Sequence, residues 1–434
     1  MRMMAAPRSG LGRFVADAQA AGRLVVQPRM GFSSPERMRA GLLSTRDVPA
    51  LTVGTITLDS YTRLGEEEAG RRMLGEGGKL NGYPILLHPR ATTHAVLAGL
   101  SDQGFPVQVR HGSPTPERIF DRLVDLGLEA SEGGPVSYCL PYGRTPLKVS
   151  VDSWKRACEL LGRLRGQNAE PHLETFGGCL LGQLCPPGLL IAVSVLEAMF
   201  FAQQGLRCLS LSYAQQVDPG QDLEALAALR TLAAKFLPGI AWHVVVYAYM
   251  GLYPRTSTGA NALLAEAAQL AVRGGAGRLI IKTVAEAYRI PTIEENTAAL
   301  CLADACAERT DRHPSPVPDT GLLAEATALV EAVLSLDDDI GAALLSAFAH
   351  GYLDVPYCLH PDNAGRTAGR IDGDGHLAWA DTGALPIPTP VDGRRAGMTA
   401  AELLTALRHV RDRFDPDPSG VVPAPLPMLD GTHR

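Results

Sequence analysis

The chain has 434 residues, 46% of them apolar, which is enough to bury the core of one barrel-sized domain with a tail or of two ordinary domains. Lysine and arginine total 40 against 46 aspartate and glutamate, so the formal charge of −6 offers no global field to nucleic acid or anionic lipid. Every apolar run is shorter than the roughly 18 residues of a membrane-spanning helix. We therefore predict no nucleic-acid and no membrane partner, and the lack of an apolar leader near the N-terminus predicts a cytoplasmic protein.

Short β-branched segments alternate with Ala/Leu-rich segments through most of the chain. The nine expected strands lie in RLVVQPRMG, ALTVGTITLD, GYPILLHP, FPVQVRHG, VSYCLPY, PHLETFG, CLSLSYAQQ, HVVVYAYMG and RLIIKTV. Helical patterns such as TPERIFDRLVDLGLEA and LEALAALRTLAAKFL separate them. Repeated βα units form a parallel sheet with helices outside, and about eight of them suit a closed (β/α)8 TIM-type barrel of the α/β class. A doubly wound open sheet is the alternative.

The alternation stops at about Thr320. Two Ala/Leu-rich helices follow, then a stretch rich in glycine, proline and aspartate from Val355 to Asp392, one more helix and a proline-rich tail. We therefore predict a barrel over residues 1–317 and a C-terminal helical and irregular extension over residues 318–434, packed on the barrel.

Several common catalytic and binding motifs are missing from the sequence. It has no GxxxxGK[ST] phosphate loop, no GxGxxG after a strand, no HExxH and no GxSxG. Its eight cysteines include no CxxC pair, so we expect buried reduced thiols and no metal site. Nucleotide-binding, zinc-protease and serine-hydrolase functions therefore have no support.

Three arginines stand at or just after predicted strand ends. Arg29 closes LVVQPR, Arg63 follows ITLDSYT, and Arg110 closes PVQVR, with His111 next. In a parallel barrel these strand ends share one rim, where such barrels place their active sites. Because the planar guanidinium matches a carboxylate with two parallel hydrogen bonds, the pattern predicts a pocket for a small dianionic substrate.

Two further segments place polar side chains near that rim. SEGGPVSYCLPYG holds Glu132, Tyr138 and Tyr142, where the glutamate could accept from a substrate ammonium and the tyrosines could donate to its carboxylates. IIKTVAEAYRIPT places Lys282 at a strand end and Glu286 four residues later, on one helical face. For this last pair, a simple surface ion pair is the alternative.

Taken together, these residues resemble the large, epsilon subunit of glutamate mutase (methylaspartate mutase), from about Arg13 to Pro386. The matching motifs, in chain order, are QPRMG, LDSYTR, LNGYP, VRHGSP, EGGPVSYCLPY, YMGLYP, IIKTVAEAYRIPT and NAGR. The resemblance implies a (β/α)8 barrel with its substrate and adenosyl site at the C-terminal rim of the strands. It also implies an isomerase that uses adenosylcobalamin for the reversible radical rearrangement of L-glutamate to L-threo-3-methylaspartate.

The resemblance also assigns individual residues. Substrate-binding positions fall on Arg29, Arg63, Arg110, His111, Glu132, Tyr138 and Tyr142, and Glu132 takes a catalytic role at the substrate amino group. Positions that line adenosylcobalamin fall on Gly31, Asn81, Pro141, Tyr253, Lys282, Glu286 and Ile290. Tyr253 replaces the family's phenylalanine, and PHLETFGGCLLGQLCPPG lacks the family's polar residues. The resemblance therefore implies that Arg29, Arg63 and Arg110 grip the substrate carboxylates, but it does not imply strict specificity for glutamate.

The resemblance implies that the cobalamin carrier is another chain. Cobalamin carriers in this family have a DxHxxG motif, which supplies the lower ligand of the cobalamin. This sequence lacks that motif. We therefore expect a small cobalamin-binding subunit with DxHxxG, which shares the cofactor and forms a heterotetramer with this chain. Three alternatives stay open: a Schiff-base aldolase or lyase that uses Lys282, a mutase-like barrel acting on a related acid, and a barrel that only binds its ligand.

Overall fold

The computed structural model describes residues 10–100, 104–141, 143–167, 169–180, 184–312, 317, 319–388 and 398–415. Eight parallel strands form the central sheet in the order β1-β8-β7-β6-β5-β4-β3-β2. β1 pairs with β8, and a parallel bridge between Val26 and Thr52 brings the segment before β2 against β1. The sheet is therefore a nearly closed barrel, which confirms the (β/α)8 prediction and excludes the doubly wound open sheet.

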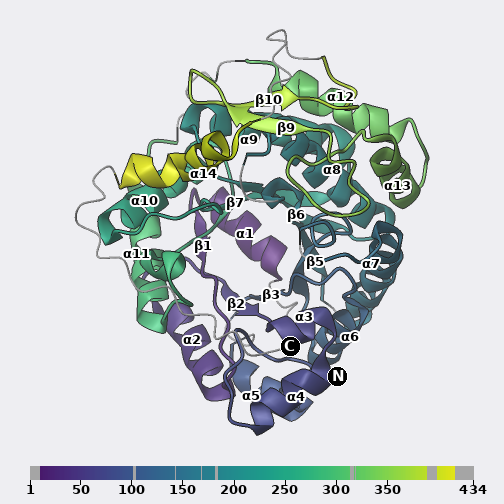
Figure 1. Ribbon diagram of the computed structural model, residues 1–434. Helices are drawn as coiled ribbons and strands as arrows, with labels where there is room; N and C mark the ends of the chain where they lie inside the picture. Colours follow the sequence, from purple (N-terminus) through teal and green to yellow (C-terminus); the bar gives the residue numbers. More distant parts are fainter. Residues whose placement is uncertain are drawn as a thin grey trace.

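Helices alternate with the strands and form the outer wall of the barrel (Figure 1). The strands are β1 Val25–Gln27, β2 Gly54–Thr57, β3 Val107–Arg110, β4 Ala130–Gly133, β5 His172–Thr175, β6 Cys208–Ala214, β7 Ala241–Tyr247 and β8 Arg278–Ile280. The helices after them are α2 Pro35–Asp47, α3 Ser60–Leu64, α4 Glu67–Gly75, α5 Arg90–Leu97, α6 Glu117–Leu126, α7 Leu147–Gly162, α8 Pro187–Gln203, α9 Pro219–Phe236, α10 Ser257–Arg273 and α11 Ile293–Arg309. Polar N-caps begin several of them: Ser34, Asp218 and Thr256 each accept from the backbone N–H three residues later.

Helix α1 (Leu11–Ala20) closes one end of the barrel. Its apolar residues pack against Val25, Val53 and Ala130, which lie at or just before the first residues of β1, β2 and β4. Figure 1 shows this helix inside the ring of strands. Since α1 covers the N-terminal ends of the strands, the C-terminal ends form the rim at which barrels of this type build their sites.

Seven of the nine expected strands are confirmed, and two are wrong. GYPILLHP contributes only a bridge between Tyr83 and Leu58, because Pro84, which has no backbone donor, follows at once and the chain turns. The described residues of VSYCLPY, Val136 to Pro141, lie in consecutive turns. The strand of that βα unit is β4, just before it, whose small and polar sequence ASEG gives no hydrophobic pattern.

The C-terminal part adds helices and a small sheet outside the barrel. Helices α12 (Leu322–Leu334) and α13 (Ile340–His350) pack against α8, which is why α8 is apolar on nearly all sides. Strands β9 (Ala368–Ile371) and β10 (Leu377–Asp381) pair antiparallel, and α14 (Ala400–Phe414) packs on α10 (Figure 1).

The boundary at residue 317 stays a prediction, and the proline-rich tail lies outside the described residues. In the described part of the chain, no helix combines the length and apolarity needed to cross a membrane.

Candidate active site

The barrel interior holds a layer of hydrogen-bonded polar side chains, which we call the polar floor: Gln27, Gln108, Glu174, Ser210 and Arg278. Arg278 of β8 and Glu174 of β5 form a fully buried ion pair. Ser210 Oγ donates to Glu174 Oε2 at 3.0 Å, and Arg278 Nη1 donates to Gln108 Oε1 at 3.2 Å. Gln27 Nε2 donates to the same Gln108 oxygen at 2.8 Å. Both charges are thus paired and hydrogen-bonded, as buried charges require.

Tyr247, the last residue of β7, connects the polar floor to the rim. Its hydroxyl lies 2.6 Å from Glu132 Oε2 and also hydrogen-bonds Glu174. Glu132 of β4 accepts from Arg110 Nε at 2.7 Å and from the Tyr138 hydroxyl. Arg110 is 5% exposed and Glu132 is 1% exposed, so their ion pair is buried. The structure therefore brings together three of the predicted substrate residues: Arg110, Glu132 and Tyr138.

His111 packs into an aromatic cluster beside this pair. Its ring stacks on Trp154 with centroids 5.7 Å apart and meets the Tyr138 ring edge-on at 5.2 Å. Burial lowers the pKa of His111 to about 3, so the imidazole is neutral near pH 7. Since its Nδ1 accepts from the Ser113 backbone N–H at 3.0 Å, the single proton is carried by Nε2, which makes His111 a neutral donor.

Arg63 reaches the same part of the rim from helix α3. That helix begins at Asp59, whose carboxylate accepts from the Thr62 N–H at 3.0 Å. The Arg63 side chain passes against Gly112, where an added Cβ would lie 2.9 Å from Arg63 Cδ. Gly112 also has a φ of +68°, a backbone conformation that favours glycine. The glycine after His111 therefore leaves the space through which Arg63 approaches.

Arg29, two residues after β1, contacts the segment that follows β8. Arg29 Nη1 donates to Glu286 Oε2 at 3.3 Å, and Lys282 Nζ lies 3.8 Å from the same oxygen. Lys282 Nζ also lies 5.2 Å from the centre of the Tyr253 ring. Burial lowers the pKa of Lys282 to about 8; the charge of Glu286 opposes this shift, and the charges of Arg29 and Arg110 add to it. The Arg110 guanidinium lies 5.2 Å from the centre of the Tyr247 ring, and Tyr247 pairs with Ile280, two residues before Lys282. This cluster and the Arg110–Glu132 pair therefore lie at the same rim, joined through the end of β7.

A pocket of about 500 Å³ adjoins Arg29. Its lining includes four of the seven positions expected to line adenosylcobalamin, namely Gly31, Asn81, Glu286 and Ile290. Tyr288 and Ile290 also line it and are half exposed, so its mouth is partly apolar. The pocket and the Lys282 cluster share Arg29 and Glu286, so six of the seven predicted cofactor residues, all but Pro141, gather on one side of the rim.

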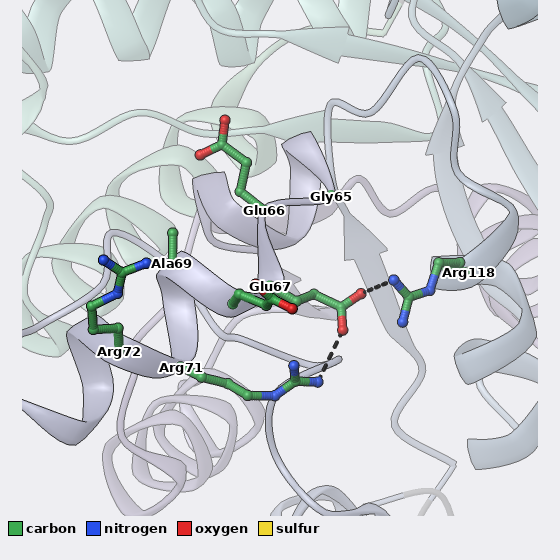
Figure 2. A pocket seen from close by; sticks show the side chains of 8 residues that line it. Gly65, Glu66, Glu67, Ala69, Arg71, Arg72 and Arg118 are labelled. Atoms are coloured by element: carbon green, nitrogen blue, oxygen red, sulfur yellow. Dashed lines mark hydrogen bonds and ion pairs between the residues drawn. The ribbon is translucent and has the colours of Figure 1, made fainter.

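A second pocket, of about 550 Å³, lies over the start of α4. Figure 2 shows the Glu67 carboxylate between Arg118 and Arg71, and the Arg71 Nη2 atom lies 3.1 Å from Glu67 Oε2. Glu66 and Arg72 point away from this group (Figure 2). This pocket contains none of the predicted site residues, and two guanidiniums already neutralise its central carboxylate.

Two predicted residues lie outside the clusters above. Pro141 is half-buried in the turn that follows Tyr138, and Tyr142 lies outside the described residues. Over the part of the chain that the structure describes, no group of His, Cys, Asp and Glu side chains could hold a metal ion.

The sequence analysis does not identify Glu174, Tyr247 and Arg278 as site residues. Each lies within a segment expected as a strand, and the hydrophobic pattern assigns such segments to the core. A signal is nevertheless present, because HLET and RLII each carry a charged residue in a strand that is buried along its whole length. A charge in such a strand needs a partner inside the barrel.

The match to known proteins extends along most of the chain. A model of the methylaspartate mutase E chain (MutE) family matches residues 7–399. The chain is 31% identical to the glutamate mutase epsilon subunit of Yersinia enterocolitica over 397 residues, which cover 87% of this chain and 81% of that protein. It is 29% identical to the epsilon subunit of Escherichia coli O157:H7, with 85% and 79% covered, and 28% identical to that of Halobacterium salinarum, with 86% and 81% covered. A family match of this length, on a barrel with this rim, means that the chain belongs to the methylaspartate mutase E chain family.

Proposed function

We propose that the chain is the large subunit of an adenosylcobalamin-dependent glutamate mutase. The reaction is the reversible rearrangement of L-glutamate to L-threo-3-methylaspartate, which makes the enzyme an isomerase. Family membership supports this proposal, and one observation carries it: the Arg110–Glu132 pair and the Arg29–Glu286–Lys282 cluster lie at the same rim, joined through Tyr247 at the end of β7. A substrate group and a cofactor group can therefore lie next to each other.

The buried Arg110–Glu132 pair suits the charges of an amino acid. A substrate ammonium can bind Glu132 while a carboxylate binds Arg110, so both buried side chains keep an opposite charge when the pair opens. Arg63 and Arg29 supply further guanidiniums for the second carboxylate, each able to form two parallel hydrogen bonds. His111 and Tyr138 add neutral donors beside Glu132. Holding both carboxylates fixes the substrate's carbon skeleton while its bonds rearrange.

The residues near Lys282 fit an adenosyl group. Glu286 can accept from ribose hydroxyls and Lys282 can donate to them, while the pocket beside Arg29 gives room for a flat heterocycle. Adenosylcobalamin, when bound, supplies the radical chemistry that no protein side chain provides. The work of this chain is to orient the substrate and to exclude water and other hydrogen donors from the buried site.

We also propose that a separate small cobalamin-binding subunit with a DxHxxG motif covers the rim and that the two chains form a heterotetramer. Two features support a covered rim: this sequence lacks DxHxxG, and Leu252, Tyr288 and Ile290 expose apolar side chains in the segments that follow β7 and β8.

A reconstitution assay tests the proposal. The chain is mixed with a cobalamin-binding subunit, adenosylcobalamin and L-glutamate, and the expected product is methylaspartate. Glu132→Gln should lower turnover far more than glutamate affinity, because the amide oxygen still accepts from the substrate ammonium but cannot act on its proton during the reaction. No product from the complete mixture would refute the proposed reaction, and full activity without the small subunit would refute the proposed partner.

One observation favours a second candidate, a Schiff-base aldolase or lyase. A lysine at a strand end whose pKa is lowered to about 8 is neutral often enough to attack a carbonyl group. Borohydride trapping of a substrate on Lys282 would support this candidate. Dicarboxylate binding without any cobalamin-dependent turnover would instead indicate a binding protein, and turnover of another acid would indicate a related mutase.

A further inference from the structure

Glu197 is a buried carboxylate between helix α8 and the barrel, and the substrate and cofactor contacts described above do not include it. The side chain is fully buried. Its Oε1 accepts from the backbone N–H groups of Val136 at 3.2 Å and Ser137 at 2.8 Å. Its Oε2 accepts from Ser137 Oγ at 2.9 Å and from the Phe176 N–H at 3.3 Å. One carboxylate therefore binds both the loop after β4 and the residue after β5.

Two glycines make this contact possible. An added Cβ at Gly134 would lie 2.0 Å from Glu197 Oε1, and one at Gly177 would lie 2.6 Å from the Ser194 backbone nitrogen of α8. Neither approach leaves space for a side chain. Ser194, one turn before Glu197, also hydrogen-bonds Thr175 Oγ1 at 2.7 Å. Helix α8 is thus fixed directly against the C-terminal ends of β4 and β5.

The two loops that Glu197 joins carry the groups around the reacting substrate. Ser137 immediately precedes Tyr138, whose hydroxyl donates to Glu132. The Phe176 ring lies 5.1 Å from the Tyr138 ring and 5.5 Å from the Tyr247 ring, centroid to centroid. A shift of either loop would therefore change how two tyrosines meet the Glu132 carboxylate.

We propose that Glu197 is a positioning residue for the reaction: it holds the loops after β4 and β5 together and so sets the geometry of Tyr138, Tyr247 and Glu132. The inference rests on the proposed function, since it names a determinant of turnover at that same site. Glu197 itself touches neither substrate nor cofactor. Its role requires two acceptor oxygens, because each oxygen serves donors that the other does not reach.

The substitution Glu197→Gln tests this requirement. Glutamine keeps the shape of the side chain but turns one acceptor oxygen into a donor, so one loop loses its partner whichever way the amide is oriented. Asp222→Asn is the matched control. Asp222 of α9 is also a buried carboxylate, but it accepts from the Tyr213 hydroxyl at 2.8 Å and the Gln216 N–H at 2.9 Å, both at the end of β6.

Both variants are assayed with the small subunit, adenosylcobalamin and glutamate, and their melting temperatures are measured. Glu197→Gln should lower kcat by about 10- to 100-fold and leave the KM for glutamate within about threefold, as expected for a displaced catalytic geometry. Asp222→Asn should leave both constants near those of the wild type. Equal kcat values in the two variants, at comparable melting temperatures, would overturn the inference.

Hydrogen exchange separates this inference from the proposed function. The amides of Val136, Ser137 and Phe176 should exchange faster in Glu197→Gln but not in Asp222→Asn, whether or not the wild type turns over glutamate. If the wild type forms no methylaspartate, the proposed function fails, and the exchange result alone decides whether Glu197 holds the two loops. Unchanged exchange at these three amides would then overturn the inference, and faster exchange in both loops would support it.

Discussion

Tyr247 is the residue whose change tests most directly how the barrel interior supports the rim. Its hydroxyl, which has one proton to donate, lies within hydrogen-bond distance of two buried carboxyl groups, Glu132 of the rim and Glu174 of the polar floor. Tyr247→Phe removes that hydroxyl and leaves the ring in place. A hydrogen bond to a charged group contributes about 1.5–3 kcal/mol, so the loss should lower the free energy of unfolding by about that amount.

The effect on turnover should be separate from the effect on stability. Without the hydroxyl, Glu132 keeps Arg110 and Tyr138 as partners but loses its fixed connection to the polar floor. We expect kcat for methylaspartate formation to fall by about 10- to 100-fold, because small misplacements of a catalytic group cost this much. Denaturant unfolding and steady-state kinetics of the reconstituted enzyme measure the two effects.

Tyr213→Phe provides the control for this prediction. Tyr213 is fully buried, and its hydroxyl donates to a carboxylate, that of Asp222, at 2.8 Å. Both substitutions thus remove a tyrosine hydroxyl that bonds a buried carboxyl group, once beneath the rim and once away from it. Both should lower stability, and only Tyr247→Phe should lower kcat. A Tyr247→Phe enzyme that is destabilised but turns over at the wild-type rate would refute the reasoning.

Three further predictions concern stability and pH. Folding lowers the pKa of Lys282 from 10.5 to about 8, so the free energy of unfolding of the wild type decreases as pH falls through 8. Denaturation should therefore show that the stability of Lys282→Met, relative to the wild type, increases from pH 10.5 down to pH 8. Folding raises the pKa of Asp222 from 3.8 to about 8, so wild-type stability is lost as pH rises. Between pH 4 and 8, the stability of Asp222→Asn relative to the wild type should increase by about 1.4 kcal/mol per pH unit. A stability difference that does not change with pH would contradict this prediction. Asp354 accepts from the N–H groups of residues 365–367 at 2.7, 2.6 and 2.9 Å. Asp354→Ala should therefore lower the free energy of unfolding by about 1–3 kcal/mol and speed hydrogen exchange of these three amides. Unchanged exchange would contradict this prediction.

The architecture and part of the site could be predicted because they depend on local patterns. Alternation of β-branched and Ala/Leu-rich segments indicates a βα unit wherever it occurs, and Arg110 at a strand end indicates a rim position once a barrel is expected. Strand β4 was not predictable in this way. Its sequence ASEG is buried because it faces the polar interior, so it carries Glu132 where a hydrophobic pattern would require an aliphatic residue.

Partners that are distant in the sequence could not be predicted from local patterns. Arg29 binds Glu286, which lies 257 residues away, and the sequence offers no reason to prefer this carboxylate to any other near the rim. The same holds for Tyr247, whose segment VVVYAY has the composition of an ordinary core strand. Its hydroxyl matters only because closure of the barrel places β7 across from the carboxylates of β4 and β5.

The charge balance of the interior is consistent with the dicarboxylate site that we propose, although the chain as a whole is acidic. The chain as a whole carries a formal charge of −6, yet the ion pairs of the rim and polar floor join three arginines and a lysine to three carboxylates. The two charges balance within each of the deeper pairs, Arg278 with Glu174 and Arg110 with Glu132. The excess positive charge of these ion pairs therefore lies toward the outer rim, where Arg29 and Lys282 share Glu286. Because these groups are partly removed from water, their attraction for an anion is stronger than that of exposed arginines. A substrate with two carboxylates and one ammonium would therefore complete the local charge balance, with its ammonium at Glu132 and its carboxylates toward the guanidiniums.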